Sequence, residues 1–88
     1  MMVGRITGAR IMFQRVEVVW HDAFAIADTW METDDIDDQP CEVTSIGYLI
    51  PDKKPGHVVL AQSHNTHEHV DSVLAIPDAM VRSVTHLK

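Results

Sequence analysis

Three histidines and one aspartate lie within eight residues of each other and could supply imidazole and carboxylate ligands to a metal ion. They are His64, His67, His69 and Asp71. Imidazole nitrogens and carboxylate oxygens are ligands that zinc and nickel accept, so a loop holding three of them round one ion would suit a metal-dependent enzyme. The group has no cysteine partner and no defined turn in the sequence. We therefore interpret the segment as a polar, exposed loop and expect no metal and no cofactor.

The motif around these histidines, THEHVDS at residues 66–72, resembles the metal motif of the metallo-β-lactamase fold. That motif reads Thr-His-x-His-x-Asp-His, and the resemblance implies zinc ions that generate hydroxide. Ser72 stands where the last histidine is expected. The chain, at 88 residues, is also too short for that layered α/β/α fold, whose other ligands come from distant loops. We therefore do not assign the chain to that family.

The acidic run from Glu32 to Asp38 invites a calcium interpretation. An EF-hand loop counted from Asp34 requires a glycine at its sixth position and a glutamate at its twelfth. The chain has Gln39 and Ser45 there, so the match fails. A solvated loop, or an acidic patch that speeds encounter with a basic partner, explains the run better. The residues that we assign to partner binding are Asp34, Asp35, Asp37, Asp38, Trp30 and Tyr48.

Cys41 and the large aromatic side chains have simple interpretations. Cys41 precedes a predicted strand and has no activating base nearby in the sequence, so we expect a buried, weakly reactive thiol. Trp20, Trp30, Tyr48 and Phe24 suit a core, although surface aromatic side chains also concentrate binding energy. The sequence has no phosphate-binding glycine loop, no paired catalytic carboxylates and no nucleophile elbow. We therefore expect no catalytic residues and a protein that is not an enzyme.

The elements that must position these residues are short strands. Alternating or Val-rich apolar stretches predict them at residues 13–20, 43–50, 57–62, 73–76 and 81–87. Residues 51–56, with the sequence PDKKPG, predict the loop of a β-hairpin, and residues 77–80 predict one 3₁₀ turn. Residues 21–30 fit a short helix or an ordered loop equally well, and residues 63–72 predict a polar loop.

These elements predict a mainly β fold, a small five-stranded antiparallel SH3-like or Sm-like barrel or roll with a short helical segment. The domain spans residues 13–88, and we expect residues 1–12 to be a flexible N-terminal extension. Gly47, inside a predicted strand, indicates a bulge or a sharp bend. The side chains expected in the core are Val18, Trp20, Ile46, Tyr48, Val59, Leu74, Ile76, Val84 and Leu87.

Composition and charge argue against several classes of protein. The chain has 13 acidic and 7 basic residues and a net charge of −6, with no basic stripe, so we expect no direct binding to nucleic acid. No apolar run approaches the roughly 20 residues of a membrane span, so we expect no membrane association. Cys41 is the single cysteine, which suits a reducing cytosol.

A series of short motifs along residues 13–88 carries a resemblance. They are VxVxWxDA from Val16, then Trp30, TSIGYL from Thr44, VLAQS from Val59 and IP from Ile76. In this order they resemble a group of short phage and prophage proteins that carry no assigned activity. The resemblance implies a phage origin and a location in the cytoplasm of a bacterial host. It carries over no catalytic residue.

Together these features predict a non-enzymatic phage accessory protein that binds a host or phage protein, with inhibition of a host system as one form of this action. A self-assembling homo-oligomer, either structural or holding a ligand between subunits, is an alternative, because small barrels can pair their edge strands. A metal-dependent enzyme that uses the histidine-rich loop is a further alternative.

Overall fold

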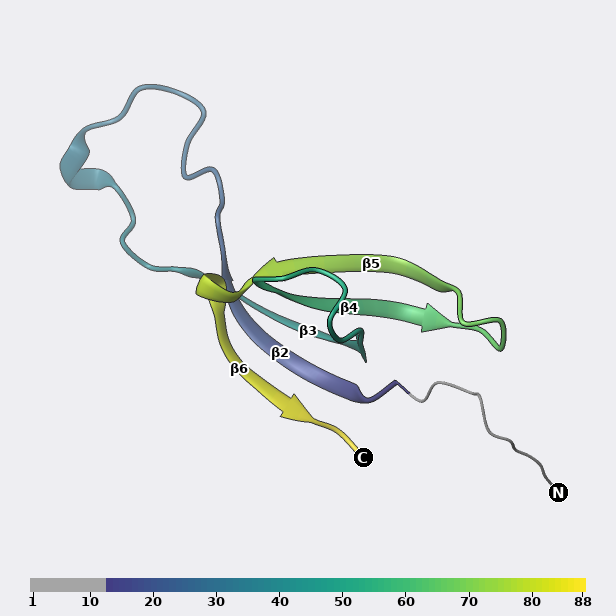
Figure 1. The fold of residues 1–88 in the computed structure, drawn as a ribbon. Helices are drawn as coiled ribbons and strands as arrows, with labels where there is room; N and C mark the ends of the chain where they lie inside the picture. The colour runs from purple at the N-terminus through teal and green to yellow at the C-terminus, as the bar shows by residue number, and fades with distance from the viewer. Residues whose placement is uncertain (1–12) are drawn as a thin grey trace, which may run out of the picture.

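The computed structural model describes residues 13–88, which form one antiparallel sheet of five strands (Figure 1). The strands are β2 (Arg15–Asp22), β3 (Cys41–Leu49), β4 (His57–His64), β5 (Val70–Pro77) and β6 (Val81–His86). Two 3₁₀ helices, η1 (Thr33–Asp35) and η2 (Asp78–Met80), are the helical segments of this part, and neither is long enough to cross a membrane. The predicted mainly β fold is confirmed, whereas the predicted N-terminal extension lies outside the described residues.

The strand order across the sheet is β5-β4-β3-β2-β6, so the last strand, β6, lies beside β2, the first strand of the described residues. Strands β5 and β6 form the two edges, and no ladder joins them within residues 13–88. Closure of the sheet into a barrel therefore stays a prediction.

The connection between β4 and β5 is shorter than the predicted polar loop. Asn65 closes the turn early, because its Oδ1 accepts hydrogen bonds from the backbone N–H of His67 at 2.9 Å and of His69 at 3.1 Å. Glu68 completes the turn with a φ of 64°. Asparagine often organises turns in this way. The prediction of a loop over residues 63–72 is thus wrong, since the two strands take up both of its ends.

The core lies mainly on one face of the strongly bent sheet. Its buried hydrophobic side chains are Val16, Val18, Trp20, Val59, Leu60, Ala61 and Ile76. Burial alternates along β2, as expected for a strand with one face inward. The predicted burial of Val18, Trp20, Val59 and Ile76 is confirmed. Three further buried residues, Val16, Leu60 and Ala61, were not among the side chains predicted for the core.

The predicted inward face of β3 is wrong. Ile46 is 66% exposed and Tyr48 is half-buried, because Ser45 and Gly47 point into the core instead. These two small residues lie directly opposite the buried valines of β2. They leave space for the indole of Trp20, whose Nε1 donates a hydrogen bond to Ser45 Oγ at 3.0 Å. The inward face of β3 is therefore the one whose small side chains fit against the large side chains of β2, and not the one with more apolar residues.

Three further side chains of the predicted core are exposed. Leu74, Val84 and Leu87 are 39%, 38% and 38% exposed, respectively. Leu74 and Val84 lie on the edge strands β5 and β6, and Leu87 follows β6. An edge strand has a neighbour on one side only, so even its inward side chains are incompletely covered. The prediction that these three are buried is therefore wrong.

Candidate functional site

The connection between β2 and β3, residues 23–40, is the longest one between the strands, and we call it the acidic loop. All of its residues are exposed. It holds six of the 13 acidic residues of the chain and no lysine, arginine or histidine. The remaining seven acidic residues balance the seven basic ones, so the whole net charge of −6 is concentrated in this loop.

The acidic loop also exposes five large apolar side chains. Trp30 is 99% exposed, and Phe24, Ile26, Met31 and Ile36 are between 41% and 50% exposed. Single apolar side chains are common on protein surfaces, but five in one exposed loop make this loop a candidate interaction site. The helix that residues 21–30 could form is absent, because His21 and Asp22 belong to β2 and residues 23–30 form no regular structure.

Paired strands form the base of the acidic loop. The β2–β3 ladder continues to its last pair, Asp22 opposite Cys41, where Cys41 is half-buried rather than buried as expected. His21 Nε2 lies 3.6 Å from Glu42 Oε2, and Arg82 Nε donates to His21 Nδ1 at 3.1 Å. These contacts join the two strands at the base of the loop and link His21 to Arg82 of β6. From this base the loop projects away from the five strands (Figure 1).

Local hydrogen bonds shape the acidic part of the loop without neutralising it. Helix η1 is held by a bond from Asp35 N to Glu32 O at 3.0 Å. Gln39 donates from its backbone N–H to Asp37 Oδ1 and from its amide to Asp38 Oδ1, at 2.9 and 3.0 Å. Within residues 13–88, no carboxylate of the loop forms an ion pair. The charges therefore face solvent and are available to a partner.

The structure groups most of the residues assigned to partner binding, but it separates one of them. Trp30 and the four aspartates share the acidic loop. Tyr48 lies opposite Arg15, at the far end of the β2–β3 ladder from the Asp22–Cys41 pair. Seven residues of strand span roughly 23 Å, so Tyr48 and the acidic loop do not form one surface.

Tyr48 belongs instead to a small aromatic cluster. The ring of His64 makes edge contacts with Tyr48, at a centroid distance of 4.5 Å, and with Phe13, at 5.3 Å. His67 and His69 lie on the turn, with their ring centroids 6.4 Å apart. In the part of the chain that the structure describes, no three His, Cys, Asp or Glu side chains lie close enough together to hold a metal ion. The geometry therefore lends no support to the metal interpretation.

This arrangement predicts that the three histidines contribute unequally to stability. Changing His64 to Ala removes two edge contacts between rings and should lower the free energy of unfolding by about 1 kcal/mol. Changing His67 or His69 to Ala on the exposed turn should alter it by less than about 0.5 kcal/mol. Urea unfolding of the three variants measures the difference. Equal effects at all three positions would contradict the aromatic cluster.

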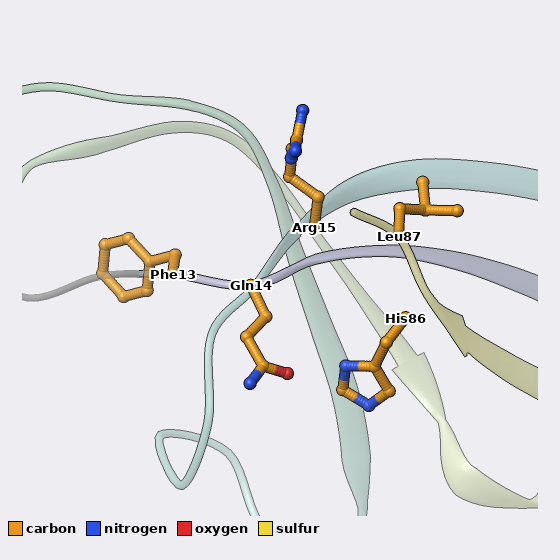
Figure 2. A pocket seen from close by; sticks show the side chains of 5 residues that line it. All are labelled: Phe13, Gln14, Arg15, His86 and Leu87. Carbon is orange, nitrogen blue, oxygen red and sulfur yellow. The ribbon is translucent and has the colours of Figure 1, made fainter.

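A hollow that the sequence did not predict lies at the open end of β2 and β6. It is lined by Phe13, Gln14, Arg15, His86 and Leu87. Figure 2 shows that Gln14 and His86 point to one side of the sheet, while Arg15 and Leu87 point to the other. No two of its titratable side chains face each other, so we assign it no acid–base chemistry.

No protein-family model, curated protein or solved structure matches this chain.

The chemistry that the acidic loop offers is recognition. Carboxylates accept charge-assisted hydrogen bonds from lysine and arginine, and an exposed indole can pack on apolar surface or against a cation. The sequence analysis assigned the four aspartates and Trp30 of this loop to partner binding. It did not assign Phe24, Ile26 and Met31, which the structure also exposes in the loop. Their position in the sequence was the available signal, because all three lie in the stretch between His21 and Lys53 that contains acidic residues and no basic residue.

Proposed function

We propose that this chain is a non-enzymatic binding protein whose acidic loop docks on a basic surface of another protein. The observation that carries the proposal is the loop itself, which combines a charge of −6 with a Trp30 side chain that is 99% exposed. The order of sequence motifs adds that the chain is a phage accessory protein. Its partner is then a host or phage protein in the bacterial cytoplasm, and inhibition of a host system is one form of its action.

The two properties of the acidic loop serve different steps of binding. Its concentrated negative charge attracts a basic partner over long range and raises the association rate. Its apolar side chains, Trp30 foremost, then become buried and slow dissociation, because large aromatic anchors provide much of the energy of protein interfaces. The same charge opposes contact between the apolar groups of different copies in the free state.

Trp30 gives a direct test of the proposal. Partners captured from a host lysate should be identified, purified and titrated against the chain. Trp30→Ala should weaken binding by roughly tenfold to a hundredfold, because it removes the central apolar anchor. In a Trp20→Phe background, Trp30 is the sole tryptophan, so its fluorescence should lose accessibility to quenchers when the partner binds. Ile46→Ala, which truncates an exposed apolar side chain on β3, is the control and should bind normally. A partner that binds Trp30→Ala as tightly as the parent is evidence against the proposed site.

The four aspartates give a second, independent test. Changing Asp34, Asp35, Asp37 and Asp38 together to Asn should lower the association rate about tenfold at low salt, with little effect near 1 M salt, where charges are screened. Stopped-flow association across a salt series measures this. A matched control removes four exposed charges elsewhere, with Asp52→Asn, Glu68→Gln, Asp71→Asn and Asp78→Asn. Equal association rates for both quadruple variants at low salt would reduce the loop to a solubility feature.

A further inference from the structure

Among the described residues 13–88, strand β5 (Val70–Pro77) forms an edge of the sheet and lacks the usual protection. Its sequence, VDSVLAIP, contains one charged residue, Asp71, and no lysine. Val70, Val73 and Leu74 are 38%, 53% and 39% exposed. Natural sheets normally protect such an edge with charges, prolines, bulges or a covering segment, because its free backbone groups can pair with another strand. Beyond the positive φ of Ser72, residues 73–76 show none of these features.

The hydrogen bonds of the sheet identify the backbone groups that this edge offers. Ile50 N donates to Val59 O at 2.9 Å, so the backbone of Val59 faces β3. Ala75 lies opposite Val59 in the antiparallel β4–β5 ladder. Because antiparallel pairs alternate between bonded and non-bonded, Ala75 directs its N–H and C=O away from β4. Val73, two residues earlier, does the same. These groups have no partner strand within residues 13–88.

The opposite edge, β6 (Val81–His86), is protected. Its register with β2 shifts between Val19 and Trp20, which disrupts the strand locally. Arg82 lies at this irregularity and bonds to the carbonyls of Ala79 and Val81 at 3.4 and 3.5 Å. A bulge and a charged side chain are both devices that discourage strand pairing. The contrast between the two edges singles out β5.

We infer that β5 pairs antiparallel with β5 of a second copy of this chain, about a two-fold axis at Leu74. In this register Val73 lies opposite Ala75 of the second copy, and each such pair exchanges both of its backbone hydrogen bonds. The two Leu74 side chains meet on the core face, where one copy leaves each of them partly exposed. A two-fold interface uses the same surface on both subunits, and the outward groups of Val73 and Ala75 satisfy that condition.

The charge distribution favours a second copy as the occupant. Each chain carries a net charge of −6, yet residues 72–77 carry none, so the paired strands do not repel each other. The acidic loop, which holds this net charge, joins β2 to β3 and projects away from the sheet (Figure 1). Pairing would also add apolar burial, which a domain of this size needs.

Sedimentation equilibrium of the full chain over a range of concentrations tests the inference. The parent should reach a mass twice the 9.9 kDa of one chain. Val73→Lys places a charge at the centre of the paired edge and should abolish the dimer. Ala75→Pro should do the same, because it removes an outward N–H that the single chain does not use. Circular dichroism should show that both variants keep the fold of the parent.

Thr85→Lys is the matched control, since Thr85 is an exposed residue of the other edge strand, β6, and lies opposite Glu17 rather than a core valine. This variant should still dimerise. If it dissociates as Val73→Lys does, β5 pairs with β6 of the next copy and the two-fold arrangement is overturned. A parent that is monomeric at every concentration overturns the inference as well, and so does a dimer that persists in both β5 variants.

Discussion

Replacing Trp20 by Ala is expected to lower the free energy of unfolding by roughly 3–5 kcal/mol. The side chain is only 9% exposed and packs against Val16, Val18, Leu60 and Ile76 in the main core cluster. Truncation would leave a cavity among these side chains. It would also remove the hydrogen bond to Ser45 Oγ.

This loss of stability is a large part of the total free energy of unfolding of the domain. Small domains are stable by only about 5–15 kcal/mol, and the buried core described here consists of seven hydrophobic side chains. Urea unfolding followed by far-ultraviolet circular dichroism measures the change. Trp30→Ala is the matched control, because it removes the same side chain from a position that is 99% exposed, and its stability should change by less than about 0.5 kcal/mol. A Trp20→Ala protein that melts within a few degrees of the parent would show that Trp20 is not a core residue.

The positions of the strands could be predicted from the sequence because each contains apolar, mostly β-branched residues, although β4 and β5 extend further than predicted at the Asn65 turn. The hairpin turn PDKKPG separates β3 from β4 as expected, and η2 (Asp78–Met80) follows Pro77 as expected. The predicted burial of Val18 and Trp20 correctly identified the inward face of β2. In all these cases the local pattern and the tertiary packing favour the same structure.

The inward face of β3 could not be predicted because local pattern and packing disagree there. Ile46 and Tyr48 are the larger and more apolar side chains, so apolar counting places them inside. The core instead needs small residues opposite β2, because Trp20 already fills the space beside Ser45. That requirement depends on the register between strands, which is not visible in either strand alone.

The acidic loop could be predicted in part. Its aspartates and Trp30 follow from charge and residue type, but the separation of Tyr48 from them depends on which end of the β2–β3 ladder each occupies. Similarly, the sequence places His64 beside His67 and His69, whereas the strand carries it to the rings of Phe13 and Tyr48. His64 is thus separated from His67 and His69, because it ends β4 while they lie on the turn that Asn65 organises.

Gly47→Val tests the packing argument for β3 directly and should destabilise the fold by on the order of 3 kcal/mol. Gly47 is buried, and a Cβ at this position would lie 2.9 Å from the carbonyl oxygen of Ala61 and 3.3 Å from Cβ of Leu60. Both contacts involve β4 at the point where it crosses close to β3. The carbonyl belongs to the backbone of a buried residue, so it cannot move aside as a flexible side chain would. Any added side chain must therefore push the two strands apart.

The control for this prediction is Thr44→Val on the exposed face of the same strand, which should change stability by less than about 0.5 kcal/mol. Gly56→Ala separates steric from backbone effects, because Gly56 has open space around it but a φ of 75°, and should cost about 1–2 kcal/mol through its backbone alone. Urea midpoints of the three variants decide the matter. If Gly47→Val unfolds at the same midpoint as Thr44→Val, β4 does not approach β3 this closely. The side chains of Ile46 and Tyr48 would then again be candidates for the inward face.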